Sequence, residues 1–169
     1  NHLLVAGYTI PDVAKYAFLG PLVGAGARIA FAPLTDKFGG APWTLVSSVG
    51  LFGSIIFTAQ HVNPDVALGA TYLSSEFHAF IYGMIAIFFF AGIGNASTFK
   101  QMPMIFEPRQ AGGVIGWVSA IAAFGPFLFG IGLVAMSPST FLMVLSGYVV
   151  LCFLITWFRY AKPGAAKKS

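Results

Sequence analysis

The chain has 169 residues, of which 57% are hydrophobic and only 8% are charged, and its net charge is +4. A soluble domain carries about 25% charged residues, so this composition excludes an ordinary soluble domain and indicates a membrane protein. The single cysteine, Cys152, excludes an internal disulfide, and the cysteine and histidines lack the spacing of a metal site. No Ser/His or Asp/Asp pairing indicates catalysis, so we expect no enzyme activity, no metal and no cofactor.

Apolar segments of about 20 residues are long enough to cross a bilayer as helices. The sequence predicts five of them, at residues 15–34, 41–60, 78–106, 113–136 and 139–160, followed by a basic tail at 161–169. Residues 61–77 are expected to form a polar loop, and Pro103 is expected to kink or end the third helix. We therefore expect an all-α membrane protein. Because it opens on Asn1, without a methionine and in the middle of a pattern, we also expect a fragment that lacks an N-terminal part.

The positive charges predict the orientation of these helices. Only Lys15 falls at one end of the predicted bundle, whereas seven cations fall at the other end. These seven are Lys37, Lys100, Arg109, Arg159, Lys162, Lys167 and Lys168. Cytoplasmic loops carry an excess of Lys and Arg, so we expect a cytoplasmic C-terminus. Topology thus explains the basic tail, and we expect no binding of nucleic acid.

The first predicted helix carries one charge in its middle, Arg28. A cation at the centre of a spanning helix costs about 2.5–3.5 kcal/mol on insertion scales, so such residues usually face a bundle interior or a water-filled path. Gly20, Gly24 and Arg28 recur every four residues, so they share one face and leave space beside the guanidinium. Arginine donates paired hydrogen bonds to planar oxyanions, which makes Arg28 a candidate anion ligand. The alternative is a structural arginine that snorkels to the lipid headgroups or bonds a carbonyl.

The turn after this helix reads Asp36-Lys37-Phe-Gly39-Gly40. A charge pair followed by two glycines has two interpretations. It is either a simple tight turn or a gate latch, in which Asp36 caps or pairs with the end of a neighbouring helix.

The third predicted helix holds small and polar residues near its end, among them Asn95, Ser97 and Thr98. Their side chains are able to hydrogen-bond a passing anion or a neighbouring helix. Helix packing is the favoured interpretation for Ser97 and Thr98, whereas both interpretations stay open for Asn95.

The fourth predicted helix presents one face of small residues that includes Gly116 and Ser119. Such a face permits close approach of a second helix and sliding along it, and static packing is the alternative. A role in transport requires Ser119 to point into a cavity.

In this order, the motifs resemble the C-terminal half of a nitrate/nitrite porter of the major facilitator superfamily. Gly20–Gly40 resembles the eighth helix of that family and the turn after it. Ala91–Pro103 resembles the end of helix ten, and Gly116–Phe127 resembles the glycine-rich nitrate signature of helix eleven. The resemblance implies that the five helices correspond to helices 8–12 of a twelve-helix fold.

The resemblance also implies a mechanism, in which two bundles alternate around one mid-membrane site. Arg28 would be one of two arginines that hold nitrate or nitrite, and Gly116 and Ser119 would line the site or let helix eleven move. The second arginine would come from the missing N-terminal half, which is the expected partner. The expected location is the bacterial inner membrane.

The sequence leaves two questions with more than one answer: how transport is coupled, and which substrate is carried. No Asp, Glu or His falls clearly within a predicted helix, which favours nitrate/nitrite antiport over nitrate/proton symport. The symport stays an alternative because the missing half could supply a proton carrier. Two other hypotheses are a transporter half for another small anion and a truncated membrane protein that does not transport.

Overall fold

The computed structural model describes residue 11 and residues 14–165, and every regular element in these ranges is a helix. The elements are α1 (Ala14–Ala17), α2 (Leu19–Phe38), α3 (Gly40–His61), η1 (Val66–Leu68), α4 (Ala70–Ile105), α5 (Pro108–Ala123), α6 (Gly125–Ala135), α7 (Pro138–Thr156) and η2 (Trp157–Ala161).

Five stretches of the described chain are long and apolar enough to cross a membrane. They are Lys15–Phe38, Gly40–His61, Ala70–Ile105, Pro108–Ala135 and Pro138–Ala161. This confirms the predicted all-α membrane fold with five transmembrane helices, and the molecule is a multi-pass membrane protein.

The turn between α2 and α3 is shorter than the sequence predicts. Thr35–Gly40 was expected to leave the helix, but α2 continues to Phe38 and only Gly39 separates it from α3. Gly39 adopts φ 87°, a conformation that glycine tolerates and other residues rarely adopt. Because this one residue reverses the chain, Thr35 stays helical and donates its hydroxyl to the carbonyl of Ala32 at 2.7 Å.

The third spanning helix starts earlier than expected. Residues 61–77 were predicted to be a loop, yet α4 begins at Ala70. The Asp65 carboxylate accepts a hydrogen bond from the backbone of Ala67, which starts the short η1 turn. Gly69, with φ 89°, then redirects the chain into α4, which ends at Ile105, soon after Pro103.

The fourth spanning segment is not one continuous helix. It starts at Pro108 rather than at residue 113, and it is interrupted at Phe124, between α5 and α6. Pro126 lies in the first turn of α6. Proline lacks an amide hydrogen and its ring clashes with the preceding turn, so it cannot continue the hydrogen-bond ladder of α5.

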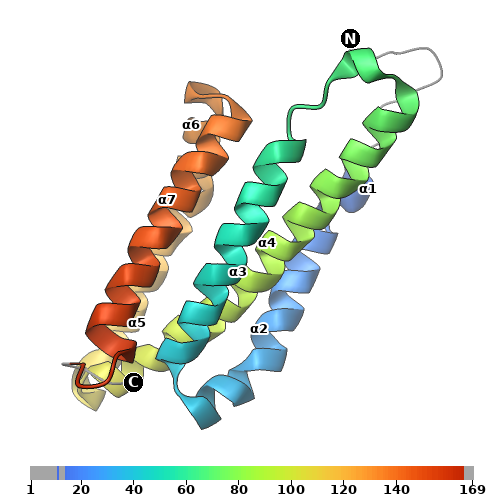
Figure 1. The fold of residues 1–169 in the computed structure, drawn as a ribbon. Coiled ribbons are helices and arrows are strands. Elements are labelled where there is room, and N and C mark those ends of the chain that lie inside the picture. The colour runs from blue at the N-terminus through green and yellow to red at the C-terminus, as the bar shows by residue number, and fades with distance from the viewer. Residues whose placement is uncertain (1–10, 12–13, 166–169) are drawn as a thin grey trace.

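Four helices form the packed part of the described chain. α4 packs against both α2 and α3, and α3 packs against α7 on its other side (Figure 1). Hydroxyl groups join α3 to α4: Thr44 and Ser97 bond each other at 2.8 Å, and Ser47 donates to the carbonyl of Phe90 at 2.7 Å. In a bilayer, close packing and such hydrogen bonds hold helices together, because lipid is as apolar as the side chains.

α5 and α6 pack far less on the rest of the described chain. α5 contacts the end of α4, and α6 contacts α7. The contact with α7 centres on Phe141, whose ring lies 4.7 Å from that of Phe129 and covers Gly132. Most side chains of α5 and α6 are exposed in this structure.

Candidate functional site

Arg28 lies on α2 with an exposed side chain. Within residues 14–165, no carboxylate lies within ion-pair distance of its guanidinium group. The guanidinium carbon lies 5.3 Å from the ring centroid of Phe99 on α4. This is the distance range in which an aromatic face attracts a cation. Arg28 is thus held over an aromatic ring while its hydrogen-bond donors have no acidic partner in the described chain.

A close crossing of α2 and α4 positions this arginine. A Cβ added to Gly92 would lie 3.1 Å from the carbonyl carbon of Gly24 and 3.0 Å from the Cβ of Ala27, and nearer still to the carbonyl oxygen of Gly24. The two backbones are therefore almost in contact at this point. Arg28 follows Gly24 by one helical turn, so the crossing fixes the position of Arg28 along the axis of α4.

Asn95 lies on the same side of α4 as Phe99, because residues four apart on a helix share a face. Its side chain is exposed, and its amide makes no hydrogen bond to another described residue. Since Arg28 lies over Phe99, the structure brings Arg28, Phe99 and Asn95 to one side of the α2–α4 crossing. Phe99 was not selected from the sequence, although its spacing from Asn95 was a usable signal.

The Ser97 hydroxyl bonds a neighbouring helix, whereas the Thr98 hydroxyl bonds only its own helix. The Ser97 hydroxyl is fully buried and bonds Thr44, and the Thr98 hydroxyl donates to the carbonyl of Gly94 at 2.7 Å. The Ser97 contact agrees with the favoured packing interpretation, which stays a prediction for Thr98.

Gly116 and Ser119 lie on α5 and are both exposed. The Ser119 hydroxyl donates to the carbonyl of Ile115 in its own helix at 2.8 Å. In the described chain α5 packs on the end of α4 and on α6, so the structure does not bring these two residues against Arg28.

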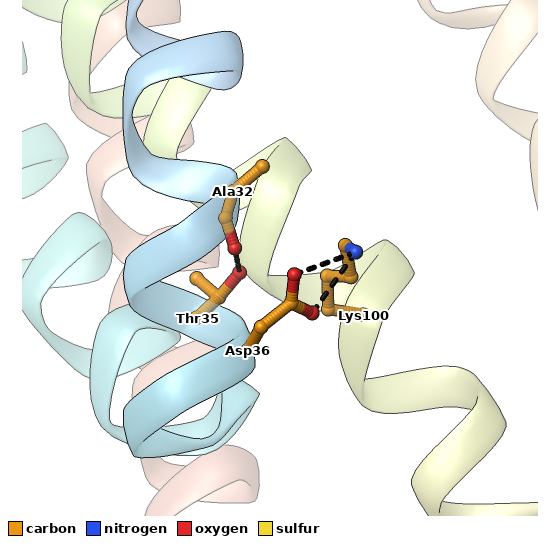
Figure 2. A network of polar contacts seen from close by, with 4 residues as sticks. All are labelled: Ala32, Thr35, Asp36 and Lys100. Carbon is orange, nitrogen blue, oxygen red and sulfur yellow. Dashed lines mark hydrogen bonds and ion pairs between the residues drawn. The ribbon is translucent and has the colours of Figure 1, made fainter.

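The last turn of α2 carries an ion pair to α4. The Lys100 ammonium lies 2.9 Å and 3.0 Å from the two carboxylate oxygens of Asp36 (Figure 2). Both side chains are about half exposed. Asp36 therefore pairs with the end of a neighbouring helix, as the latch interpretation requires, although the sequence did not identify Lys100 as its partner. The Lys37 ammonium lies elsewhere, 5.3 Å from the ring centroid of Phe38.

Gly39 and Gly40 have different structural reasons to be glycine. Gly39 needs its positive φ, whereas Gly40 is buried against α4. A Cβ added to Gly40 would lie 2.7 Å from both the Cβ of Gln101 and the carbonyl oxygen of Ser97. The turn is thus packed directly against the helix that carries Phe99 and Lys100.

A hydrogen-bonded pair of side chains lies at the opposite end of the bundle. The Glu76 carboxylate on α4 lies 2.7 Å from Nδ1 of His61 at the end of α3, and both side chains are largely buried. Glu76 is therefore helical, which the sequence did not predict, but it lies near the start of α4 and is already paired.

Curated proteins with similar sequences include three nitrate/nitrite transporters. The chain is 47% identical over 162 residues, 93% of its length, to the probable nitrate/nitrite antiporter NarK2 of Thermus thermophilus. It is 29% and 30% identical, over 98% and 94% of its length, to the nitrate/nitrite transporters NarU of Escherichia coli K12 and of Salmonella typhimurium. The chain spans 35%, 40% and 39% of the lengths of these relatives. No protein-family model matches the chain.

Proposed function

The chain is homologous to nitrate/nitrite transporters over nearly its whole length, and from this premise we propose that it forms part of a membrane transporter for nitrate or nitrite. The observation that carries the proposal is Arg28. It is an exposed cation on a spanning helix, and no acidic side chain of the described chain neutralises it.

In the proposed site, Arg28 binds the anion directly. The guanidinium is a planar fork that donates two parallel hydrogen bonds, which matches the planar oxygens of nitrate and nitrite. Phe99 holds the guanidinium from the side of α4 by the cation–ring contact. Asn95 supplies an amide with unused hydrogen-bonding capacity on the same face of α4.

The remainder of the site is proposed to come from elsewhere. The relatives are more than twice as long as this chain, so we assign the other wall of the anion site to the part of the transporter that corresponds to their additional length. α5, with its small exposed residues Gly116 and Ser119, is proposed to face this wall or to slide along it. The two parts would alternate in exposing the site to either side of the membrane.

The turn from Asp36 to Gly40 is proposed to act in gating. The Asp36–Lys100 ion pair joins the end of α2 to the end of α4, the helix that carries Phe99 and Asn95. Lys37 is exposed at the same turn, and Gly39 and Gly40 allow it to pack closely. The excess of Lys and Arg at this end places it on the cytoplasmic side in our proposal, together with the C-terminus.

For coupling, we propose exchange of nitrate against nitrite. The two carboxylates on the spanning helices of the described chain, Asp36 and Glu76, both lie near helix ends. Asp36 is ion-paired with Lys100, and Glu76 is hydrogen-bonded to His61. The described chain therefore offers no free carboxylate at mid-membrane to carry a proton. In an exchange, the returning anion neutralises the arginine, and no proton carrier is needed.

The test is nitrate binding and nitrate/nitrite exchange by the purified, reconstituted protein with and without Arg28→Lys. Lysine keeps the charge but loses the fork, so one of two charge-assisted hydrogen bonds is lost. At about 1.5–3 kcal/mol per such bond, affinity should fall by roughly 10- to 150-fold. Unchanged binding would refute the assignment of Arg28. Competition by formate or acetate at concentrations equal to nitrate would instead indicate a carrier for small carboxylates.

A further inference from the structure

An apolar groove runs along the seam between α3 and α7. It has a volume of about 180 Å³ and is open at the protein surface. Its lining residues are Ser48, Val49 and Phe52 of α3 and Val149, Val150 and Phe153 of α7. Two of these, Val49 and Val150, are 62% and 40% exposed. The groove lies on the other side of α3 from α4 and is separate from the proposed anion site.

A group of aromatic and basic residues lies at one end of this seam. α7 ends in the π-helical turn η2, which packs on α3 as well as on α7 (Figure 1). This turn carries exposed Trp157, Phe158 and Arg159, and the ammonium of Lys162 lies 5.4 Å from the ring centroid of Phe158. We call these four residues the aromatic–basic collar.

The charge at the collar is positive without compensation. α3 and α7 contain no Asp or Glu, and η2 contains none either. No carboxylate of the described chain lies within ion-pair distance of Arg159 or Lys162. In the sequence, Lys167 and Lys168 follow shortly after. The collar therefore attracts an anion, and its aromatic residues are of the kind that gather where a bilayer meets water.

The spacing between the collar and the groove matches one leaflet of a bilayer. Phe153 precedes Arg159 by six residues and Val149 precedes it by ten, which corresponds to about 9–15 Å along a helix at ~1.5 Å per residue. One leaflet of a hydrocarbon core ~30 Å thick is about 15 Å deep. If the charged headgroup of a lipid lies at the collar, the first carbons of its acyl chain therefore lie at the groove.

We propose that the α3–α7 seam binds an anionic phospholipid. Arg159 and Lys162 hold its phosphate, Trp157 and Phe158 lie beside its glycerol, and one acyl chain occupies the groove. The binding of this lipid does not depend on Arg28, so the proposal stands or falls separately from the proposed transport of nitrate.

The test is lipid binding to the purified protein, measured by native mass spectrometry with phosphatidylglycerol and phosphatidylcholine that carry the same acyl chains. Phosphatidylglycerol should bind more tightly. Arg159→Gln and Lys162→Gln should each weaken its binding about fivefold, the effect expected of one basic residue at a membrane surface. Val150→Trp, which fills the groove from an exposed position, should weaken binding of both lipids.

The matched control is Lys15→Gln, which removes one positive charge at the opposite end of the spanning helices and should leave lipid binding unchanged. Equal binding of the two lipids, or an equal loss for all three charge variants, would overturn the proposal. A seam that instead holds a second copy of the chain would also overturn it. In that case Val150→Trp would lower the fraction of dimers, and the glutamine variants would not affect lipid binding.

Discussion

Gly92→Ala is a direct test of the α2–α4 crossing that positions Arg28. The added methyl would lie 3.1 Å from the carbonyl carbon of Gly24 and 3.0 Å from the Cβ of Ala27, whereas ordinary contacts lie at 3.4–4 Å. Because the nearest atom is the backbone carbonyl oxygen of Gly24 and the Cβ of Ala27 has no rotamers, no side chain is able to rotate away. The two helices must therefore separate at this point.

The expected cost is that of overpacking a well-packed contact, about 1–3 kcal/mol. We expect a fall of several degrees in the unfolding temperature of the purified protein in detergent. Nitrate affinity should also fall, because Arg28 moves away from Phe99. Addition of nitrate should stabilise the variant less than it stabilises the original protein, which reports affinity and stability in one assay.

Gly26→Ala is the matched control. Gly26 lies on α2 near the same crossing, but a Cβ there meets no atom within 4 Å. This variant should keep the original unfolding temperature and nitrate affinity, or gain slightly in stability from the better helix propensity of alanine. If Gly92→Ala behaved like Gly26→Ala, the close crossing would be wrong, and with it our explanation of where Arg28 lies.

Two further predictions concern contacts between α2 and α4. Phe99→Leu removes the ring beneath Arg28 and should lower nitrate affinity about 2- to 30-fold, the range that corresponds to about 0.5–2 kcal/mol for a cation–ring contact, whereas Phe99→Tyr should retain it. Equal affinities of the Leu and Tyr variants in a binding titration would argue against the contact. For the ion pair, Asp36→Lys and Lys100→Asp should each slow exchange, and the double variant should recover part of the rate. Because both side chains are about half exposed, the coupling in a double-mutant cycle should not exceed about fivefold. Additive effects would show that the pair has no role in gating.

The five spanning helices were predictable because each is a long apolar stretch. The length and polarity of a stretch decide whether it is able to cross a membrane as a helix. The errors arose where single residues act locally. Gly39 reverses the chain alone, and Pro126 interrupts a segment that is uniformly apolar. Glu76 is helical because Gly69 starts α4 early and because His61 supplies a partner for its carboxylate. Hydropathy reports neither the early start of α4 after Gly69 nor the partner that His61 provides.

The candidate site was predictable only in part, because the sequence shows unusual residues but not their neighbours. Arg28 is conspicuous as the one charge inside an apolar helix. Phe99 is one of many phenylalanines, and its four-residue spacing from Asn95 indicates a shared site only when α2 and α4 are placed side by side. In the same way, Lys100 served to predict the orientation of the helices in the membrane, but its pairing with Asp36 became visible only in the structure.

The contact between Gly24 and Gly92 also limits how this sequence is able to evolve. Where a glycine faces a ring, as Gly132 faces Phe141, a larger residue is tolerable once the ring is replaced by a smaller side chain. At Gly92 the obstacle is the carbonyl group of Gly24, which no substitution removes. Among homologous proteins with this crossing, positions 132 and 141 should therefore vary together, whereas position 92 should stay glycine irrespective of its neighbours.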